Sequence, residues 1–308
     1  MKYKIICQYC DNVIENFTKW YSEGQCCSKC GSTFVNVEYD NLIDKIKRSL
    51  NSDNKDINGL NRYYEILPIE SKKNCINAGE NNVSIERWTF LEKYAQMLGY
   101  NLQVYAHRHD NNPATGTFKD LAGSNIASIL KEIGAKYYTV ASTGNVGVAL
   151  SRYLSEANIS LHVFLPKNAS LLQEAEISCF GQKVYRVNGD YTYAKQLCAR
   201  FAAKHDIPIS PNLYDPVRIE AKKTMAYEWV RQKENLPDVY IQALSGGTGP
   251  LGIAKGSREL IQSGYAKKIP RLLLVQSDSC DPMSQSWRNS KCKNFPDGWQ
   301  NSYCVIEN

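Results

Sequence analysis

Residues 137–157 read YYTVASTGNVGVALSRYLSEA, and this stretch decides the fold class. It opens with a run of β-branched and aromatic residues, Tyr137–Ala141, that predicts a buried strand. A glycine-containing turn follows at Ala141–Gly147, and the helix-length stretch Val146–Ala157 comes next. A strand that passes through a tight turn directly into a helix is the repeating unit of a parallel sheet covered by helices.

The same alternation of strand and helix continues on both sides of this stretch. Further strands are expected at Leu161–Leu165, Val184–Val187, Val239–Leu244 and Leu272–Val275. Further helices are expected near Leu121–Ile133, Tyr193–Lys204, Pro216–Gln232 and Pro250–Ser263. The pattern predicts an α/β protein with helices on both faces of a parallel sheet, in which ligands bind at the carboxyl ends of the strands.

A second glycine-rich turn, Leu244–Gly249, lies between a predicted strand and a predicted helix. Glycines let backbone N–H groups approach an anion, and the N-terminus of the following helix adds a favourable dipole. Either turn alone is weak evidence for a ligand, because tight strand-to-helix turns also need glycine for packing. Two such turns in one chain favour a single anionic ligand held between them.

The chain has eleven cysteines, an odd number, and four of them form two closely spaced pairs near the N-terminus. Cys7-x2-Cys10 and Cys27-x2-Cys30 are separated by sixteen residues, a spacing typical of zinc sites. Four thiolates complete a tetrahedral shell and leave no open position for a substrate, so the predicted zinc ion is structural. The alternative is a set of reduced cysteines that bind no metal.

Composition narrows the class of protein. The chain has 308 residues, of which 43% are hydrophobic and 22% charged, as in ordinary globular proteins. Its formal net charge of +6 is mild and gives no reason to expect a nucleic-acid partner. No stretch reaches the uncharged apolar length that spans a bilayer, and the start MKYKIICQYC has no apolar segment of signal-peptide length. We therefore expect a cytoplasmic protein with no membrane partner.

The segment Asn112–Asp120 reads NPATGTFKD and places Lys119 between Phe118 and a predicted helix. A single lysine is ordinarily a solvated surface charge. Desolvation would lower its pKa and make the amine a competent nucleophile and base. Burial decides between these two interpretations, and the sequence does not show burial.

The segment is similar to the cofactor-lysine motif of threonine synthases, N-P-T-G-S-F-K-D-R, and the cysteine pairs resemble the N-terminal zinc ribbon of some members. Further similarities follow in the order of that family, at Gly59–Tyr63 with Leu67-Pro68, Gly79-Glu80, Ser142–Asn145, Asp215–Thr224, Pro237-Asp238 and Pro270–Gln276. The resemblance covers nearly the whole chain. It implies an α/β fold of pyridoxal-phosphate (PLP) fold type II, tryptophan synthase beta-like, with two α/β/α domains of parallel or mixed sheets after a small zinc ribbon.

The resemblance also implies the roles of individual residues. Lys119 would hold the cofactor and then act as the catalytic base at the α-carbon of the substrate. The cofactor would be bound further by Asn145 at its 3′ oxygen and, at its phosphate, by Gly246, Gly247, Thr248 and Gly249. The amino-acid substrate would be bound by Ser142, Thr143, Gly144, Thr117 and His107.

The implied domain organisation assigns residues 1–40 to the zinc ribbon and residues 121–204 to the smaller α/β domain. Residues 41–120 and 205–308 would form the larger, PLP-binding domain, without its C-terminal part. Members of the family continue for tens of residues beyond the position of Asn308, and three explanations stay open. The first is that the chain is truncated, the second is that another chain supplies the missing part, and the third is that the protein is a degenerate relative. Relatives with this fold are commonly dimers, so a homodimer is expected.

Departures from the motif bear on the substrate. Leu121 stands where threonine synthases have arginine, and His107 stands where they have lysine. The leucine after F-K-D and the run Tyr240–Gly249 are similar to a sister family, cysteate synthase. The expected function is a PLP-dependent carbon–oxygen lyase or synthase that acts, like threonine synthase, on a small O-phosphorylated amino acid by elimination and replacement.

Two alternatives stay open for the function. One is a cysteate synthase-like β-replacement transferase that acts on O-phosphoserine. The other is a catalytically silent protein that uses the fold and the zinc ribbon for binding or regulation.

Overall fold

The structure is a computed structural model that describes residues 2–51, 59–211 and 214–291. Residues 292–308 of the expected larger domain lie outside the described part. Among the residues that are described, no helix combines the length and the apolar character needed to cross a lipid bilayer.

One half of the molecule is a three-stranded parallel sheet with the order β6-β7-β8. Its strands alternate with helices in chain order: β6 (Tyr137–Ala141), α5 (Asn145–Glu156), β7 (Ser160–Pro166), α6 (Leu171–Cys179), β8 (Lys183–Val187) and α7 (Tyr191–His205). The two faces of the sheet have separate cores. Val163 and Leu165 of β7 belong to the main core, whereas Phe164 packs with Val187 and with Cys198 of α7. Helices therefore cover both faces, as a parallel sheet requires.

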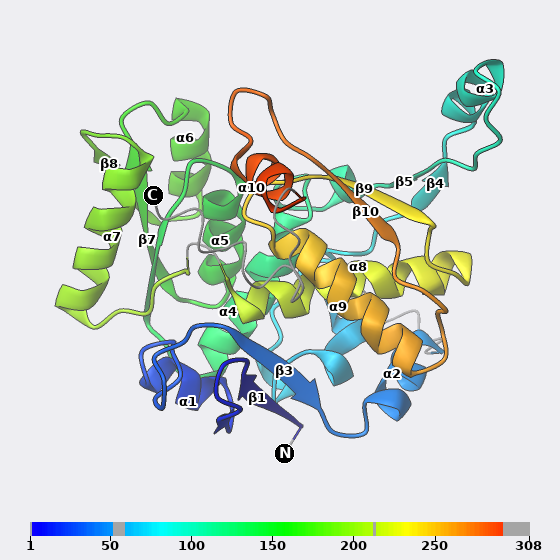
Figure 1. The fold of residues 1–308 in the computed structure, drawn as a ribbon. Helices are drawn as coiled ribbons and strands as arrows, with labels where there is room; N and C mark the ends of the chain where they lie inside the picture. Colours follow the sequence, from blue (N-terminus) through cyan, green and yellow to red (C-terminus); the bar gives the residue numbers. More distant parts are fainter. Residues whose placement is uncertain (1, 52–58, 212–213, 292–308) are drawn as a thin grey trace.

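The other half contains a second parallel sheet and three long helices. Its elements are α4 (Lys119–Glu132), α8 (Pro216–Lys233), β9 (Val239–Ala243), α9 (Thr248–Gln262), β10 (Arg271–Val275) and α10 (Pro282–Lys291). Strands β9 and β10 are parallel and in register. Helix α8 packs against both α4 and α9, with nearly every residue from Pro216 to Val230 buried (Figure 1). It is therefore the central helix of the half that carries Lys119.

Two glycines let α9 lie directly against α8. A Cβ added at Gly252 would lie 2.8 Å from Lys222 C and Cβ, and one added at Gly256 would overlap the Lys223 carbonyl oxygen. A methyl group forced into such a contact moves the two helices apart, and overpacking of this kind costs about 1–3 kcal/mol. Gly256→Ala is therefore expected to lower the urea midpoint of unfolding.

The matched control is Gly246→Ala, because a Cβ at Gly246 meets no atom within 4 Å. It is expected to leave the midpoint nearly unchanged. Equal midpoints for the two variants would show that α8 and α9 are not in close contact.

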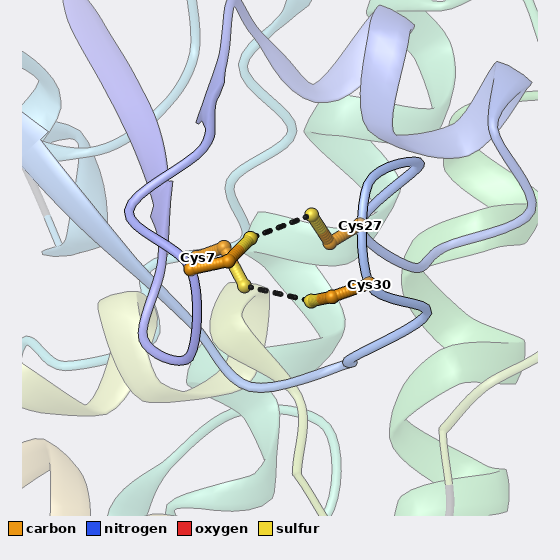
Figure 2. A group of neighbouring side chains, drawn as sticks. Cys7, Cys27 and Cys30 are labelled. Carbon is orange, nitrogen blue, oxygen red and sulfur yellow. Dashed lines mark hydrogen bonds between the residues drawn. The ribbon is translucent and has the colours of Figure 1, made fainter.

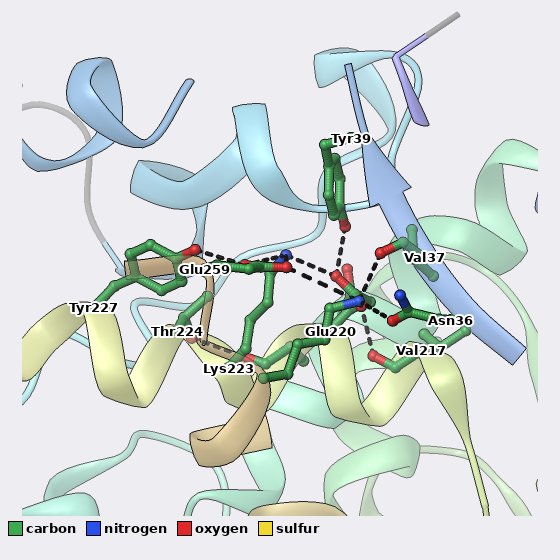
Figure 3. A network of polar contacts seen from close by, with 12 residues as sticks. Asn36, Val37, Tyr39, Val217, Glu220, Lys223, Thr224, Tyr227 and Glu259 are labelled. Carbon is green, nitrogen blue, oxygen red and sulfur yellow. Dashed lines mark hydrogen bonds and ion pairs between the residues drawn. The ribbon is translucent and has the colours of Figure 1, made fainter. Parts of the chain in front are cut away.

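The N-terminal segment forms a separate antiparallel sheet with the order β2-β1-β3. Its elements are β1 (Tyr3–Cys7), β2 (Val13–Ile14), α1 (Phe17–Ser22) and β3 (Val35–Tyr39), followed by α2 (Leu42–Leu50). A buried ionic network ties β3 to α8 and α9 (Figure 3). Lys255 of α9 donates to Val37 O at 2.6 Å and to Asn36 Oδ1 at 2.8 Å, and Tyr39 donates to Glu220 at 2.6 Å.

The segment between α2 and α4 contains short elements. They are the 3-10 helices η1 (Gly59–Ile66), η2 (Lys72–Asn74) and η3 (His109–Asn111), the antiparallel strands β4 (Ile85–Arg87) and β5 (Tyr105–His107), and α3 (Thr89–Met97) between these strands. Helix α3 projects from the body of the molecule (Figure 1). Its side chains Phe90, Tyr94 and Met97 are exposed.

The predicted α/β class and the parallel pairing are confirmed. All five expected strands and all five expected helices are present, with ends shifted by a few residues. The largest difference that matters is at α4, which begins at Lys119 rather than at Leu121, so that the lysine starts the helix. Among the elements that the sequence pattern did not predict are β3, α3, α6 and the antiparallel strands β4 and β5.

Candidate active site

The loop before α4 is held by the side chains of Asn112 and Asp120, both buried. Asn112 Nδ2 donates to Thr117 O at 3.1 Å, and its Oδ1 accepts from Asn81 N at 2.9 Å. Asp120 accepts from Ala114 N at 2.8 Å and from the Thr115 hydroxyl at 2.6 Å. These bonds fix the backbone just before Lys119.

Thr117 belongs to the same loop and faces the start of α4. Its Oγ1 accepts from Lys119 N at 3.1 Å and lies 2.8 Å from Thr115 Oγ1. The hydroxyl thus satisfies the backbone N–H of the first residue of the helix. The structure places this predicted substrate residue directly beside the predicted catalytic lysine.

Lys119 is partly buried, with Nζ 4.1 Å from the centroid of the Phe118 ring. Burial, together with the charge of Arg218, lowers its pKa from the ordinary 10.5 to about 8. A pKa near 8 leaves a useful fraction of the amine neutral at physiological pH. Lys119 therefore has the chemistry of a nucleophile or base rather than that of a surface cation.

A second lysine, Lys222 of α8, shares the same aromatic ring. Its side chain is fully buried, and Nζ lies 5.1 Å from the Phe118 centroid. Burial, and then the positive charges of Lys119 and Arg218, hold its pKa well below the ordinary value. The Lys222 amine donates to Thr248 Oγ1 at 2.6 Å, so Lys222 contacts both the Phe118 ring beside Lys119 and the second glycine-rich turn.

This turn opens onto α9 and has the features of a phosphate site. Gly247 has φ +79°, a left-handed conformation suited to glycine, and Thr248 is the first residue of the helix. Added Cβ atoms would meet nothing within 4 Å at Gly246 and only Met283 Cε, at 3.7 Å, at Gly247. Open backbone, a helix N-terminus and a buried ammonium group suit a phosphate. Gly249 differs, because Gln242 fills the space beside it.

The first glycine-rich turn lies at the carboxyl end of β6. The Ser142 hydroxyl is buried and accepts from Gly144 N at 3.3 Å and from Gly147 N at 3.0 Å, so it closes the turn. The side chains of Thr143 and Asn145 are exposed at the N-terminus of α5. No measured contact joins these side chains to Lys119, so their predicted roles stay predictions.

His107, a predicted substrate residue, is half-buried with both ring nitrogens inaccessible to solvent, and its neighbour His109 is buried. His107 and His109 have ring centroids 4.0 Å apart, and the His109 ring lies 6.3 Å from the Phe118 ring. Burial lowers the pKa of His107 to about 4, so the imidazole is neutral at pH 7. Both ring nitrogens of His107 lack a hydrogen-bond partner. His107 therefore has no positive charge to offer an anion, only a neutral donor and acceptor.

Three residues of this region received no role in the sequence analysis, namely Arg218, Lys222 and Tyr191. Arg218 is paired with Asp215 at 3.0 Å, and its charge acts on both Lys119 and Tyr191. The Tyr191 hydroxyl donates to Ala141 O at 3.3 Å, next to the first turn. The sequence feature that could have pointed to Arg218 and Lys222 is the family-like segment 215–224, which contains both residues.

The four predicted metal ligands are brought together at the end of β1 and in the turns before β2 and β3, and Figure 2 labels three of them. The sulfur atoms of Cys7, Cys10, Cys27 and Cys30 all lie within 4.8 Å of one another. Cys7 Sγ is 3.5 Å from Cys30 Sγ, and Cys10 Sγ is 3.6 Å from Cys27 Sγ. A tetrahedral zinc ion with Zn–S bonds of about 2.3 Å places its sulfurs about 3.8 Å apart, so the cluster suits a metal ion.

Comparisons with known proteins agree with this geometry. Threonine synthase of Methanocaldococcus jannaschii is 27% identical over 86% of this chain and 68% of that protein. Cysteate synthase of Methanococcoides burtonii is 25% identical over 75% of this chain and 56% of that protein. This chain thus spans at most about two thirds of the length of these relatives.

Solved structures show the same fold. The processed form of threonine deaminase isoform 2 from Solanum lycopersicum superposes with a TM-score of 0.56 at 19% identity, over 83% of this chain and 64% of that chain. A pyridoxal 5'-phosphate-dependent aspartate racemase gives 0.57 at 19% identity, over 70% and 63%. The family model for pyridoxal-phosphate dependent enzymes matches residues 85–304, more than half of the sequence. The chain therefore belongs to the pyridoxal-phosphate dependent enzyme family.

Proposed function

We propose that the protein is a PLP-dependent lyase or synthase that acts, like threonine synthase, on a small O-phosphorylated amino acid. The observation that carries the proposal is the placement of Lys119. It starts α4 at a fixed loop, its pKa is lowered to about 8, and Lys222 joins it to the open turn at Gly246 and Gly247. A surface lysine would have none of these features.

The residues present fit the cofactor. Lys119 would hold it covalently, the turn from Gly246 to Thr248 would bind its phosphate, and Asn145 would contact its ring. Pyridoxal phosphate, when bound, supplies the electron sink for the electron pair left on the substrate α-carbon. Lys119 Nζ, as a neutral amine, would take the proton from that carbon.

Binding of the substrate falls to the other turn and to the charges around Lys119. The N-terminus of α5, with Ser142, Thr143 and Gly144, would receive the substrate carboxylate. Arg218 acts electrostatically on Lys119 and is paired with Asp215, and the amine of Lys222 is a further hydrogen-bond donor in the region. These basic groups favour a substrate with an additional anionic group. Thr117 and His107 would bind its uncharged part.

Absorbance spectra test the proposal and separate the alternatives. The protein reconstituted with PLP is expected to show a visible band that shifts on addition of O-phosphohomoserine, for threonine synthase-like chemistry. A shift with O-phosphoserine alone, followed by consumption of sulfite, would favour the cysteate synthase-like alternative, which the similarity to cysteate synthase supports. Absence of any band after added PLP would favour a binding or regulatory protein.

We also propose the domain boundaries and the metal site that the resemblance to threonine synthases implies. Residues 1–40 contain the antiparallel sheet and the four cysteines, which supports a zinc ribbon with a structural Zn²⁺. Residues 121–204 contain the sheet β6-β7-β8, which supports a smaller domain. Residues 41–120 and 205–308 would form the PLP-binding domain. A homodimer and a cytoplasmic location stay predictions.

A further inference from the structure

Two consecutive lysines of α8 are buried in opposite electrostatic situations. Lys223 has two carboxylate partners, Glu220 Oε2 at 2.8 Å and Glu259 Oε2 at 3.0 Å (Figure 3). Lys222 is 2% exposed, and its one hydrogen bond among the described residues is the bond to Thr248 Oγ1. No carboxylate of the described chain lies within ion-pair distance of Lys222 Nζ. A buried ammonium group without an anion is strongly disfavoured.

The charged groups around Lys222 make its lack of an anionic partner still more unfavourable. The charges of Lys119 and Arg218 oppose that of Lys222, and the opposing carboxylate of Asp215 is already paired with Arg218. An ammonium group has three donors, and Thr248 takes one of them. Thr248 is the first residue of α9, so this bond places Lys222 Nζ at the N-terminus of that helix, where the backbone of Gly246 and Gly247 is open. The missing partner is therefore an anion at this helix terminus.

We propose that Lys222 is the counter-ion of a phosphate group bound at the N-terminus of α9. If the proposed function holds, this phosphate is that of the cofactor. The lysine holds it from the α8 side, and the backbone of the glycine turn holds it from the α9 side. Lys222 is then a positioning residue that fixes the cofactor relative to Lys119.

The test compares cofactor-free wild-type protein with Lys222→Met, a neutral side chain of similar length. Inorganic phosphate is the probe, and its affinity is measured by calorimetry. Loss of a charge-assisted hydrogen bond is expected to weaken phosphate binding about 10- to 100-fold. The phosphate-dependent rise in the thermal midpoint should fall accordingly. Lys204→Met removes an exposed charge from α7 and is expected to leave phosphate binding unchanged.

Thermal midpoints without phosphate separate this role from a structural one. Lys222→Met removes a buried amine that has no anionic partner among the described residues, and it is expected to raise the midpoint of the cofactor-free protein. Lys223→Met leaves Glu220 and Glu259 without that partner and is expected to lower it. A lowered midpoint for Lys222→Met, with phosphate affinity intact, would overturn the inference.

The proposed function and this inference fail separately. A visible band with PLP in the wild-type protein, together with unchanged phosphate affinity in Lys222→Met, overturns the role of Lys222 and leaves the enzyme intact. Phosphate binding that depends on Lys222 but is not displaced by PLP supports the anion site and overturns its assignment to the cofactor.

Discussion

Replacing Lys119 with alanine is expected to abolish the visible absorbance of the protein reconstituted with PLP. The residue is the partly buried amine whose pKa is lowered to about 8, and it is fixed at the start of α4 by a hydrogen-bonded loop. Removal of both the covalent link and the base at the α-carbon is expected to reduce turnover by about 10³-fold or more. Spectra of the two proteins at equal PLP concentration provide the measurement.

Borohydride reduction locates the link independently of activity. The cofactor mass is expected on the peptide that contains Lys119 and not on the one that contains Lys222. Lys131→Ala, an exposed lysine in the last turn of the same helix, is the matched control and should keep the band. Retention of the band in Lys119→Ala would assign the cofactor to another lysine.

The lowered pKa of Lys119 also predicts how cofactor loading depends on pH. Only the neutral amine can attack an aldehyde, and the neutral fraction falls tenfold for each pH unit below the pKa. The rate of covalent loading of the cofactor-free protein is therefore expected to rise with pH up to about 8 and then to level off. A rise that continues toward pH 10 would show that the amine is as solvated as an ordinary lysine.

The periodicity of the sequence predicted the α/β alternation because strand and helix patterns are local. The strand predicted at Tyr137–Ala141 lies between two predicted helices, and its boundaries are those of β6. The elements that were missed depend on partners distant in the chain. Strand β3 exists through its pairing with β1, and the three-residue strands β4 and β5 exist only as a pair. Helix α3 projects from the body and has little tertiary contact to set a pattern.

The candidate site also has a part that the sequence predicted and a part that it did not. Family-like motifs pointed to Lys119 and to the turn at Gly246–Thr248, and the structure joins them. It does so through Lys222, whose importance depends on burial and on the lack of a carboxylate partner. Those two properties arise from the packing of α8 against α9, which no local pattern encodes. The neutral state of His107, which stands where threonine synthases have lysine, is likewise a consequence of burial.

Cys27→Ser is expected to prevent metal binding by the four-cysteine cluster and to destabilise the whole chain, far beyond the N-terminal sheet. Cys27 is fully buried within the four-cysteine cluster, and structural zinc provides about 10–16 kcal/mol of binding free energy in small zinc-binding peptides. Without it, β3 loses its anchor, and Tyr39 and the carbonyl of Val37 no longer hold Glu220 and Lys255.

The loss of stability should spread to α8 because β3 is hydrogen-bonded to the buried ionic network of α8 and α9. Losing a hydrogen bond to a buried charged group costs about 1.5–3 kcal/mol, so the thermal midpoint should fall by several degrees and the proposed cofactor site on α8 should loosen with it. Metal analysis and thermal unfolding of Cys27→Ser are compared with those of Cys179→Ser, an exposed cysteine outside the cluster that is expected to change neither. A metal-free Cys27→Ser protein with wild-type stability and PLP affinity would show that the cysteine cluster and α8 are energetically independent, despite the bonds that join them.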